Sequence, residues 1–119
     1  MVKALFDTNI LIDYLNATPA AKAELDRYQD KTISVVTWME VMVGATAKLQ
    51  VSTRAFLTGF QHIGLDDAVA DRAVQLRKAH KMKLPDAIIW ASAQVHAMLL
   101  VTRNTKDFPA DDPGIRIPY

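Results

Sequence analysis

Residues 2–15 read Val-Lys-Ala-Leu-Phe-Asp-Thr-Asn-Ile-Leu-Ile-Asp-Tyr-Leu, and this stretch decides the fold class. Its first half is a short apolar run typical of a buried strand, while Ile10, Leu11 and Tyr14 recur at helical spacing. Asp7 therefore lies where a strand gives way to a helix, with a hydroxyl and an amide in the next two positions. In a parallel α/β sheet, ligands bind at the carboxyl ends of strands. A simple helix N-cap explains Asp7 equally well, and better on this stretch alone.

The composition indicates one small domain without cysteine chemistry. The chain has 119 residues, half of them hydrophobic, which suits a single domain over residues 1–119. Its net charge of +1 predicts that any contact with nucleic acid is local rather than driven by a global positive field. The absence of cysteine excludes disulfides, thiolate zinc sites and thiol nucleophiles. The chain has no long apolar run of the kind that a signal peptide or a membrane span requires, so we expect a cytoplasmic protein.

Strand and helix signals alternate along the rest of the chain. Short β-branched or apolar runs predict strands, and apolar residues at helical spacing predict the helices between them. This alternation indicates a parallel α/β sheet with right-handed crossovers. The further strands are expected at 32–36, 62–65, 99–102 and 115–117, and the further helices at 19–28, about 41–44, 51–60, 66–80 and 84–98.

Four acids lie at strand exits or helix starts: Asp7, Glu40, Asp86 and Asp107. Each has a structural explanation of its own, and Thr37 with Glu40 matches a capping box. The alternating topology nevertheless places all four near one rim of the sheet. Carboxylates brought that close raise one another's pKa unless a cation is supplied. An all-oxygen cluster suits Mg²⁺ or Mn²⁺, which can activate water for phosphodiester hydrolysis.

The most basic run of the chain is 77–83, which reads Arg-Lys-Ala-His-Lys-Met-Lys. Cations are favourable near a helix C-terminus, so a solvated helix end explains the run. Contacts to the phosphates of a nucleic acid explain it as well. The candidate phosphate contacts are Arg77, Lys78, Lys81, Lys83 and Arg103.

Four segments closely resemble the four motifs of PIN domains: 5–11, 34–40, 84–87 and 101–108. Each motif alone is weak, but their order, spacing and the chain length together resemble VapC-type toxins of bacterial type II toxin–antitoxin systems. The likeness spans nearly the whole chain. It implies a three-layer α/β/α fold with a central, mainly parallel sheet of four to five strands.

The same resemblance implies a Mg²⁺-dependent endoribonuclease that acts on RNA, forms a homodimer and is inhibited by a VapB-like antitoxin protein. The acidic core then falls on Asp7, Glu40 and Asp86, which would bind the metal directly. Asp107 is our choice for the fourth acid, acting through water or on a second ion. The supporting residues are Thr8, through its hydroxyl, and Asn104, as a neutral helper through water.

Two other functions are compatible with parts of the sequence. The first is a non-catalytic module of the same fold that dimerises within a DNA-binding complex, although a scaffold has no physical reason to crowd carboxylates. The second is a phosphoaspartyl enzyme of the haloacid-dehalogenase kind. That pattern needs a second acid two residues after the first, where this chain has Asn9.

Overall fold

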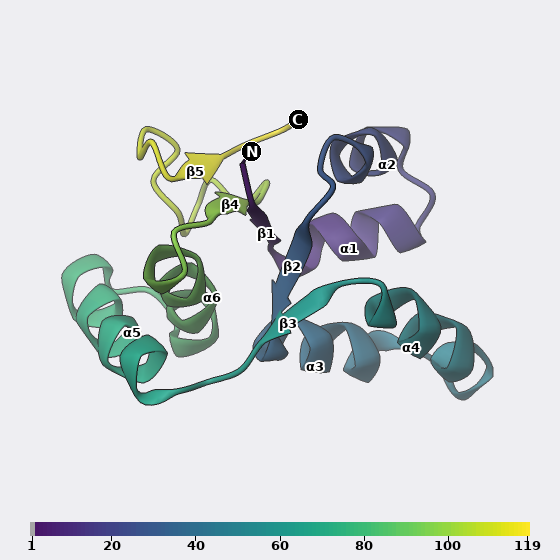
Figure 1. Cartoon of the computed structure of the whole chain (residues 1–119), viewed down its shortest axis with the longest axis horizontal. Helices are drawn as coiled ribbons and strands as arrows, with labels where there is room; N and C mark the ends of the chain where they lie inside the picture. Colours follow the sequence, from purple (N-terminus) through teal and green to yellow (C-terminus); the bar gives the residue numbers. More distant parts are fainter. Residues whose placement is uncertain (1) are drawn as a thin grey trace.

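The computed structural model describes residues 2–119 and contains a parallel sheet in the order β3-β2-β1-β4-β5 (Figure 1). Every pair of neighbouring strands is parallel. The strands are β1 (Ala4–Phe6), β2 (Lys31–Ser34), β3 (Gln61–Ile63), β4 (Leu99–Val101) and β5 (Ile115–Arg116). The predicted fold class is confirmed.

Helices cover both faces of this sheet and make the fold three-layered (Figure 1). One face carries α1 (Thr8–Leu15), α2 (Pro19–Asp26), α3 (Val35–Gly44) and α4 (Gln50–Thr58), with a 3-10 turn η1 (Ala47–Leu49) before α4. The other face carries the helical pair α5 (Asp67–His80) and α6 (Leu84–Val95). None of the helices in residues 2–119 has the length and hydrophobicity needed to cross a bilayer.

The strand side chains divide between two hydrophobic cores because successive residues of a strand point to opposite faces. Leu5 and Leu100 are fully buried in the core under α5 and α6, together with Trp90. Phe6 belongs to the other core, where its ring packs edge-on against Tyr28 at a centroid distance of 5.6 Å. Both faces of the central strands are thus covered, as is usual for a parallel sheet.

The strand order reverses at β1. The chain proceeds outward from β1 through β2 to β3 and then returns to place β4 on the opposite side of β1. Phe6 pairs in register with Val101, and the amide of Asp7 donates to the Val101 carbonyl at 2.9 Å. The residues after these two strands, Asp7 and Thr102, therefore meet at the switch point, where open α/β sheets bind their ligands.

The expected boundaries are wrong at one place that concerns the site. The sequence predicts a strand through 36 and a capping box at Thr37 and Glu40, but α3 already begins at Val35. Ser34 caps the helix, since its Oγ accepts the Val36 amide at 3.1 Å. A serine at the strand end satisfies the free amides earlier than the threonine could, so Thr37 and Glu40 lie inside the helix.

A buried ion pair fixes the edge strand β5 against α2. Arg116 donates from Nε and Nη2 to the two carboxylate oxygens of Glu24, at 2.6 and 2.9 Å, and Tyr28 donates its hydroxyl to the same group at 3.0 Å. Burial raises the pKa of Glu24, but these hydrogen bonds outweigh it and hold the pKa below its ordinary value.

Candidate active site

Asp7 is a buried carboxylate at the end of β1, with only 4% of its surface exposed. Its Oδ1 accepts the Thr8 amide at 2.7 Å, as expected of a helix N-cap. Its Oδ2 accepts the Thr102 hydroxyl at 2.8 Å and the Asn9 side-chain amide at 3.1 Å. The predicted N-cap role is confirmed, and the cap residue also lies at the centre of a polar cluster at the sheet edge.

Glu40 reaches the same edge from inside α3. The hydroxyl of Thr8 donates to Glu40 Oε1 at 2.6 Å and lies 3.1 Å from the hydroxyl of Thr37. Glu40 itself is exposed to solvent. The structure therefore joins Thr8 to Glu40 directly, and Thr37 supports that contact instead of capping a helix.

Asp86 and Asp107 approach from the other side of the sheet. Asp86 is half-buried in the first turn of α6, where acids are favourable. Asp107 lies in the loop after β4, and the side-chain amide of Asn104 donates to its Oδ2 at 2.9 Å. Asn104 also accepts the Asp107 amide at 3.1 Å through Oδ1, so it holds this acid by direct contact.

The four acids act on one another electrostatically. Burial raises the pKa of Asp7 to about 6; hydrogen bonds from Thr102 and Thr8 oppose the rise, and the charges of Asp86 and Glu40 add to it. Burial also raises the pKa of Asp86, followed by the charges of Asp107 and Glu40, against a smaller opposing effect of Lys83. Asp7, Glu40, Asp86 and Asp107 thus form one electrostatically coupled group, which we name the acidic site.

The acidic site suits a hard divalent cation by its donor chemistry. Within residues 2–119, no Lys or Arg nitrogen lies within 4.0 Å of any of its carboxylates. In the same part of the chain, no group of three or more Asp, Glu or His side chains is arranged so that it could hold a metal ion. Oxygen donors that supply only part of a coordination shell fit Mg²⁺ or Mn²⁺, because these ions retain water and take further ligands from substrate.

A basic hollow of about 470 Å³ lies at the turn between α5 and α6. Its lining residues are Arg77, Lys78, Lys81, Met82 and Lys83. The turn is well fixed: Lys81 has a left-handed backbone with φ of 54°, and Arg77 Nη1 donates to the Met82 carbonyl at 3.2 Å. Lys83 is the residue before α6, and its charge acts on Asp86 in the first turn of that helix. The structure places Arg103 elsewhere, against α1, with Nε and Nη2 donating to Asp13 at 2.6 and 3.0 Å.

Two residues that form hydrogen bonds with the predicted site residues were not themselves predicted from the sequence. Thr102 is fully buried and donates to Asp7, and Asp13 binds Arg103. Thr102 could have been recognised as a hydroxyl at the exit of the strand beside β1. Asp13 lies four residues after Asn9, hence on the same helix face, which was the available signal.

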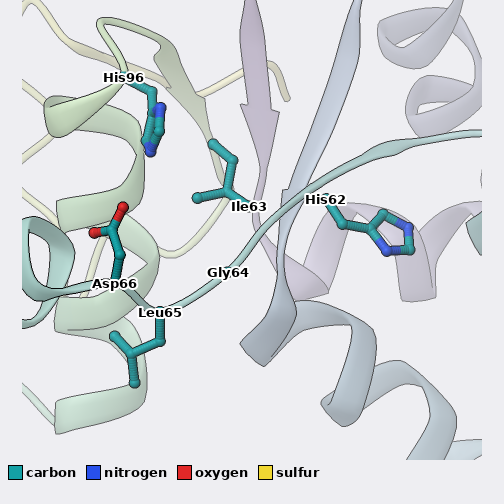
Figure 2. Close-up of a pocket in the computed structure, with 6 residues that line it drawn as sticks. All are labelled: His62, Ile63, Gly64, Leu65, Asp66 and His96. Atoms are coloured by element: carbon teal, nitrogen blue, oxygen red, sulfur yellow. The ribbon is translucent and has the colours of Figure 1, made fainter.

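The histidines lie outside the acidic site. A hollow of about 320 Å³ beside β3 is lined by residues 62–66 and His96, and none of the four acids borders it. Figure 2 shows Asp66 and His96 on its walls, while the ring of His62 points away toward the other face of the sheet. His62 Nε2 lies 2.9 Å from the Leu57 carbonyl. The His80 ring packs against Trp90 at an interplanar angle of 53°, with the ring centroids 4.9 Å apart. Each of these contacts is a packing or capping contact.

These features define a parallel α/β domain with an acidic site at the topological switch point of its sheet. The PIN domain family model matches residues 4–110. The chain belongs to the PIN-domain family, as the four motifs predicted.

Solved structures place it further within that family. A chain from a toxin–antitoxin complex of Klebsiella pneumoniae is 50% identical, with a TM-score of 0.92 over 98% of each chain. A chain from FitAB bound to an IR36 DNA fragment is 27% identical, with a TM-score of 0.83 over 97% of this chain and 94% of that one. FitAcB from Neisseria gonorrhoeae is 25% identical, with a TM-score of 0.79 over 97% of each chain. A search of curated protein sequences gave no match.

The buried charge of Asp7 predicts how stability depends on pH without divalent ions. Its pKa in the folded protein is about 6, against an ordinary value of 3.8, so its contribution to stability is full below pH 3.8 and is lost as pH rises through 6. Two pKa units correspond to about 3 kcal/mol. We expect Asp7→Asn to reduce the loss of stability between about pH 3.5 and 7 by up to this amount, measured by urea unfolding in chelator with tryptophan fluorescence.

Asp26→Asn is the matched control, because Asp26 is an exposed carboxylate paired only with Lys22 on α2. Its pH profile should follow that of the wild type. Parallel profiles for Asp7→Asn and wild type would show that Asp7 carries no buried charge in solution.

Proposed function

We propose that this PIN-domain protein is a VapC-type toxin that cleaves RNA internally, with Mg²⁺ as cofactor. The observation that carries the proposal is the buried Asp7 carboxylate, coupled to Asp86 and Glu40 at the sheet's switch point and without a cationic partner in residues 2–119. A scaffold gains nothing from such a group, whereas a metal-dependent hydrolase requires one. The 50% identical chain from a toxin–antitoxin complex supports the biological context.

The proposed roles follow from the contacts of each side chain. Asp7, Glu40 and Asp86 would hold Mg²⁺, or Mn²⁺ in its place, and Asp107 would act through water or on a second ion. Thr8 orients Glu40 and Asn104 orients Asp107 through the hydrogen bonds described above. A bound ion of this kind supplies an activated water and neutralises charge on the reacting phosphodiester.

The basic hollow is the proposed path of the RNA backbone. Arg77, Lys78, Lys81 and Lys83 line it, and the charge of Lys83 acts on Asp86. Phosphates bound there would lead the strand to the acids. Arg103 is also a candidate from sequence, but two of its donors are engaged with Asp13, so we place the phosphate contacts on the other four cations.

One observation favours a second function. A 27% identical chain, FitAB, has a structure bound to DNA, which fits the alternative of a non-catalytic dimerisation module in a DNA-binding complex. The two functions differ in whether the isolated chain cleaves RNA, and the first test below distinguishes them.

Asp7→Asn should abolish Mg²⁺-dependent RNA cleavage and leave the protein folded. The amide has nearly the same shape but lacks the charge that the ion requires. We expect a loss of at least about 100-fold in cleavage rate, the upper range for disturbing a metal site. The measurement is cleavage of total RNA by protein purified free of its partner, with and without chelator.

Asp26→Asn again serves as control and should cleave at the wild-type rate. Equal cleavage by Asp7→Asn and wild type would refute the assignment of the acidic site. Complete inactivity of the wild type with Mg²⁺ and Mn²⁺ would favour the non-catalytic module.

Neutralising the basic hollow should reduce the salt dependence of RNA binding. Each phosphate contact that is lost should lower the slope of log K against log salt by roughly 0.7. The measurement uses Lys81→Ala and Lys83→Ala in the inactive Asp7→Asn background, with a labelled single-stranded RNA. Lys3→Ala is the control, since Lys3 precedes β1 at the opposite edge of the sheet. Unchanged slopes would show that these cations do not contact phosphates and only form a solvated helix end.

Partner binding is proposed from the exposed apolar surface. An antitoxin segment would fit an apolar groove of about 320 Å³ between α1, α3 and α4, bordered by Ile12, Leu15 and Leu49. A homodimer would use the neighbouring surface, where Val43 is 86% exposed on α3 and Val51 is 83% exposed on α4. Inhibition by a cognate antitoxin and action in the cytoplasm complete the proposal.

Val43→Glu should convert the dimer to a monomer. A charge placed on a buried apolar interface is unpaired there and destabilises association by several kcal/mol. Analytical ultracentrifugation of the chain without antitoxin measures the effect, and Val2→Glu is a control at a similarly exposed valine before β1. If the Val43→Glu protein sediments like the wild type, the dimer interface does not lie on this surface.

A further inference from the structure

A chain of hydrogen bonds connects Tyr119 to the acidic site through α1. The hydroxyl of Tyr119 donates to Asp13 Oδ2 at 2.7 Å. The same carboxylate accepts Nε and Nη2 of Arg103, at 2.6 and 3.0 Å. Asp13 therefore receives three hydrogen bonds, two of them from a cation in the side-by-side geometry that fixes a guanidinium in place. We name Tyr119, Asp13 and Arg103 the clamp.

The backbone of Arg103 is fixed to the same helix as its side chain. Its amide donates to Asn9 Oδ1 at 3.3 Å, while its guanidinium binds Asp13. Asn9 and Asp13 are four residues apart and so lie on one face of α1. The backbone amide and the side chain of Arg103 are thus both bonded to α1, at residues one turn apart.

This attachment determines how Asn9 is oriented. Because its oxygen accepts the Arg103 amide, its nitrogen is turned to the opposite side. There it donates to Asp7 Oδ2 and to the Thr102 hydroxyl, both at 3.1 Å. The orientation of the amide beside the central carboxylate is therefore set by the position of Arg103.

The sequence neighbours of Arg103 each hold one acid. Thr102 donates to Asp7, and Asn104 donates to Asp107. The amide of Asn104 also bonds the Thr102 hydroxyl at 3.0 Å. A shift of Arg103 along α1 would displace both neighbours and change the separation of the two carboxylates.

We propose that Asp13 and Tyr119 are positioning residues of the acidic site, which act through Arg103 to hold Asp7 and Asp107 at a fixed separation for a divalent cation. This inference rests on the proposed function for the identity of the ion, and on the hydrogen bonds of the clamp for the mechanism. It assigns Arg103 to the site's support and not to RNA binding.

Tyr119→Phe tests the proposal with the smallest change, because it removes one exposed hydroxyl and no charge. Asp13→Asn removes the charge that holds the guanidinium. We expect each variant to bind Mg²⁺ about 10-fold more weakly by calorimetry, the low end for partners of metal ligands. In RNA cleavage, kcat should fall at fixed Mg²⁺ and recover at high Mg²⁺, with KM for RNA unchanged.

Hydrogen exchange provides a readout that needs neither metal nor activity. The amides of residues 103, 104 and 107 are all bonded within this network, to Asn9, Thr102 and Asn104 respectively. They should exchange faster in both variants. Amides of β1 and β2 should not change, which shows that the fold is intact.

Two matched controls separate the clamp from a general loss of hydrogen bonds. Tyr28→Phe removes a hydroxyl that donates to a carboxylate on α2, and Asp26→Asn removes an exposed paired carboxylate of the same helix. Both should bind Mg²⁺ and cleave as the wild type does.

Wild-type Mg²⁺ affinity in Tyr119→Phe and Asp13→Asn would overturn the inference, and so would a rise in KM for RNA with kcat unchanged. Cleavage by the wild type decides the proposed function separately. If Asp13→Asn does not fold, Tyr119→Phe decides the inference alone, because it removes no charge and leaves the ion pair of Asp13 with Arg103 in place.

Discussion

The parallel pairing of β1 with β4 is the constraint on which the rest of the structure depends. Phe6 and Val101 are in register, and each strand is followed at once by a polar residue. Asp7 and Thr102 are therefore forced together above a closed hydrophobic layer, and the carboxylate has only 4% of its surface in contact with solvent. A charge buried in this way is unfavourable unless donors or a cation compensate it.

The chain compensates this charge only in part. Three neutral donors bond Asp7, yet its pKa remains well above the ordinary value because burial outweighs them. Replacing one of these donors by a lysine would stabilise the carboxylate more, but it would also occupy the position of the proposed divalent cation. The fold tolerates the cost of the incomplete compensation because the surrounding cores are fully packed.

Hydrophobic periodicity and turn chemistry were sufficient to predict the parallel α/β class, and the resemblance to PIN domains implied its three layers. Strands and helices alternate clearly, and Asp66 caps α5 through a bond to the Val69 amide. The start of α3 was mispredicted because Val35 and Val36 are β-branched and match a strand as well as a helix. The bond from the Val36 amide to the Ser34 hydroxyl distinguishes the helix start from a continued strand. This bond depends on the backbone conformation at Ser34, which the residue types alone do not determine.

The acids of the site could be predicted, but not the way in which they are held. Topology alone brings strand exits together, so Asp7, Asp86 and Asp107 could be assigned to one rim. Glu40 reaches that rim by a different route, from inside α3, through the Thr8 hydroxyl. The ion pair of Arg103 with Asp13 spans 90 residues, and no local pattern encodes such a contact. From the sequence, Arg103 beside the predicted acids was interpreted as a substrate contact, whereas the structure shows that it pairs with Asp13.

The short edge strand β5 explains why such long-range partners are needed. It pairs with β4 only through Ile115 and Arg116, so backbone hydrogen bonds hold it weakly. Side chains supply the missing attachment, since Arg116 is bonded to Glu24 on α2 and Tyr119 to Asp13 on α1. The loop between β4 and β5 carries Asn104 and Asp107, and it is consequently fixed at both ends against the helices that follow β1. An acid on a loop can then be held as firmly as one at the end of a strand, which a site built from several separate segments requires.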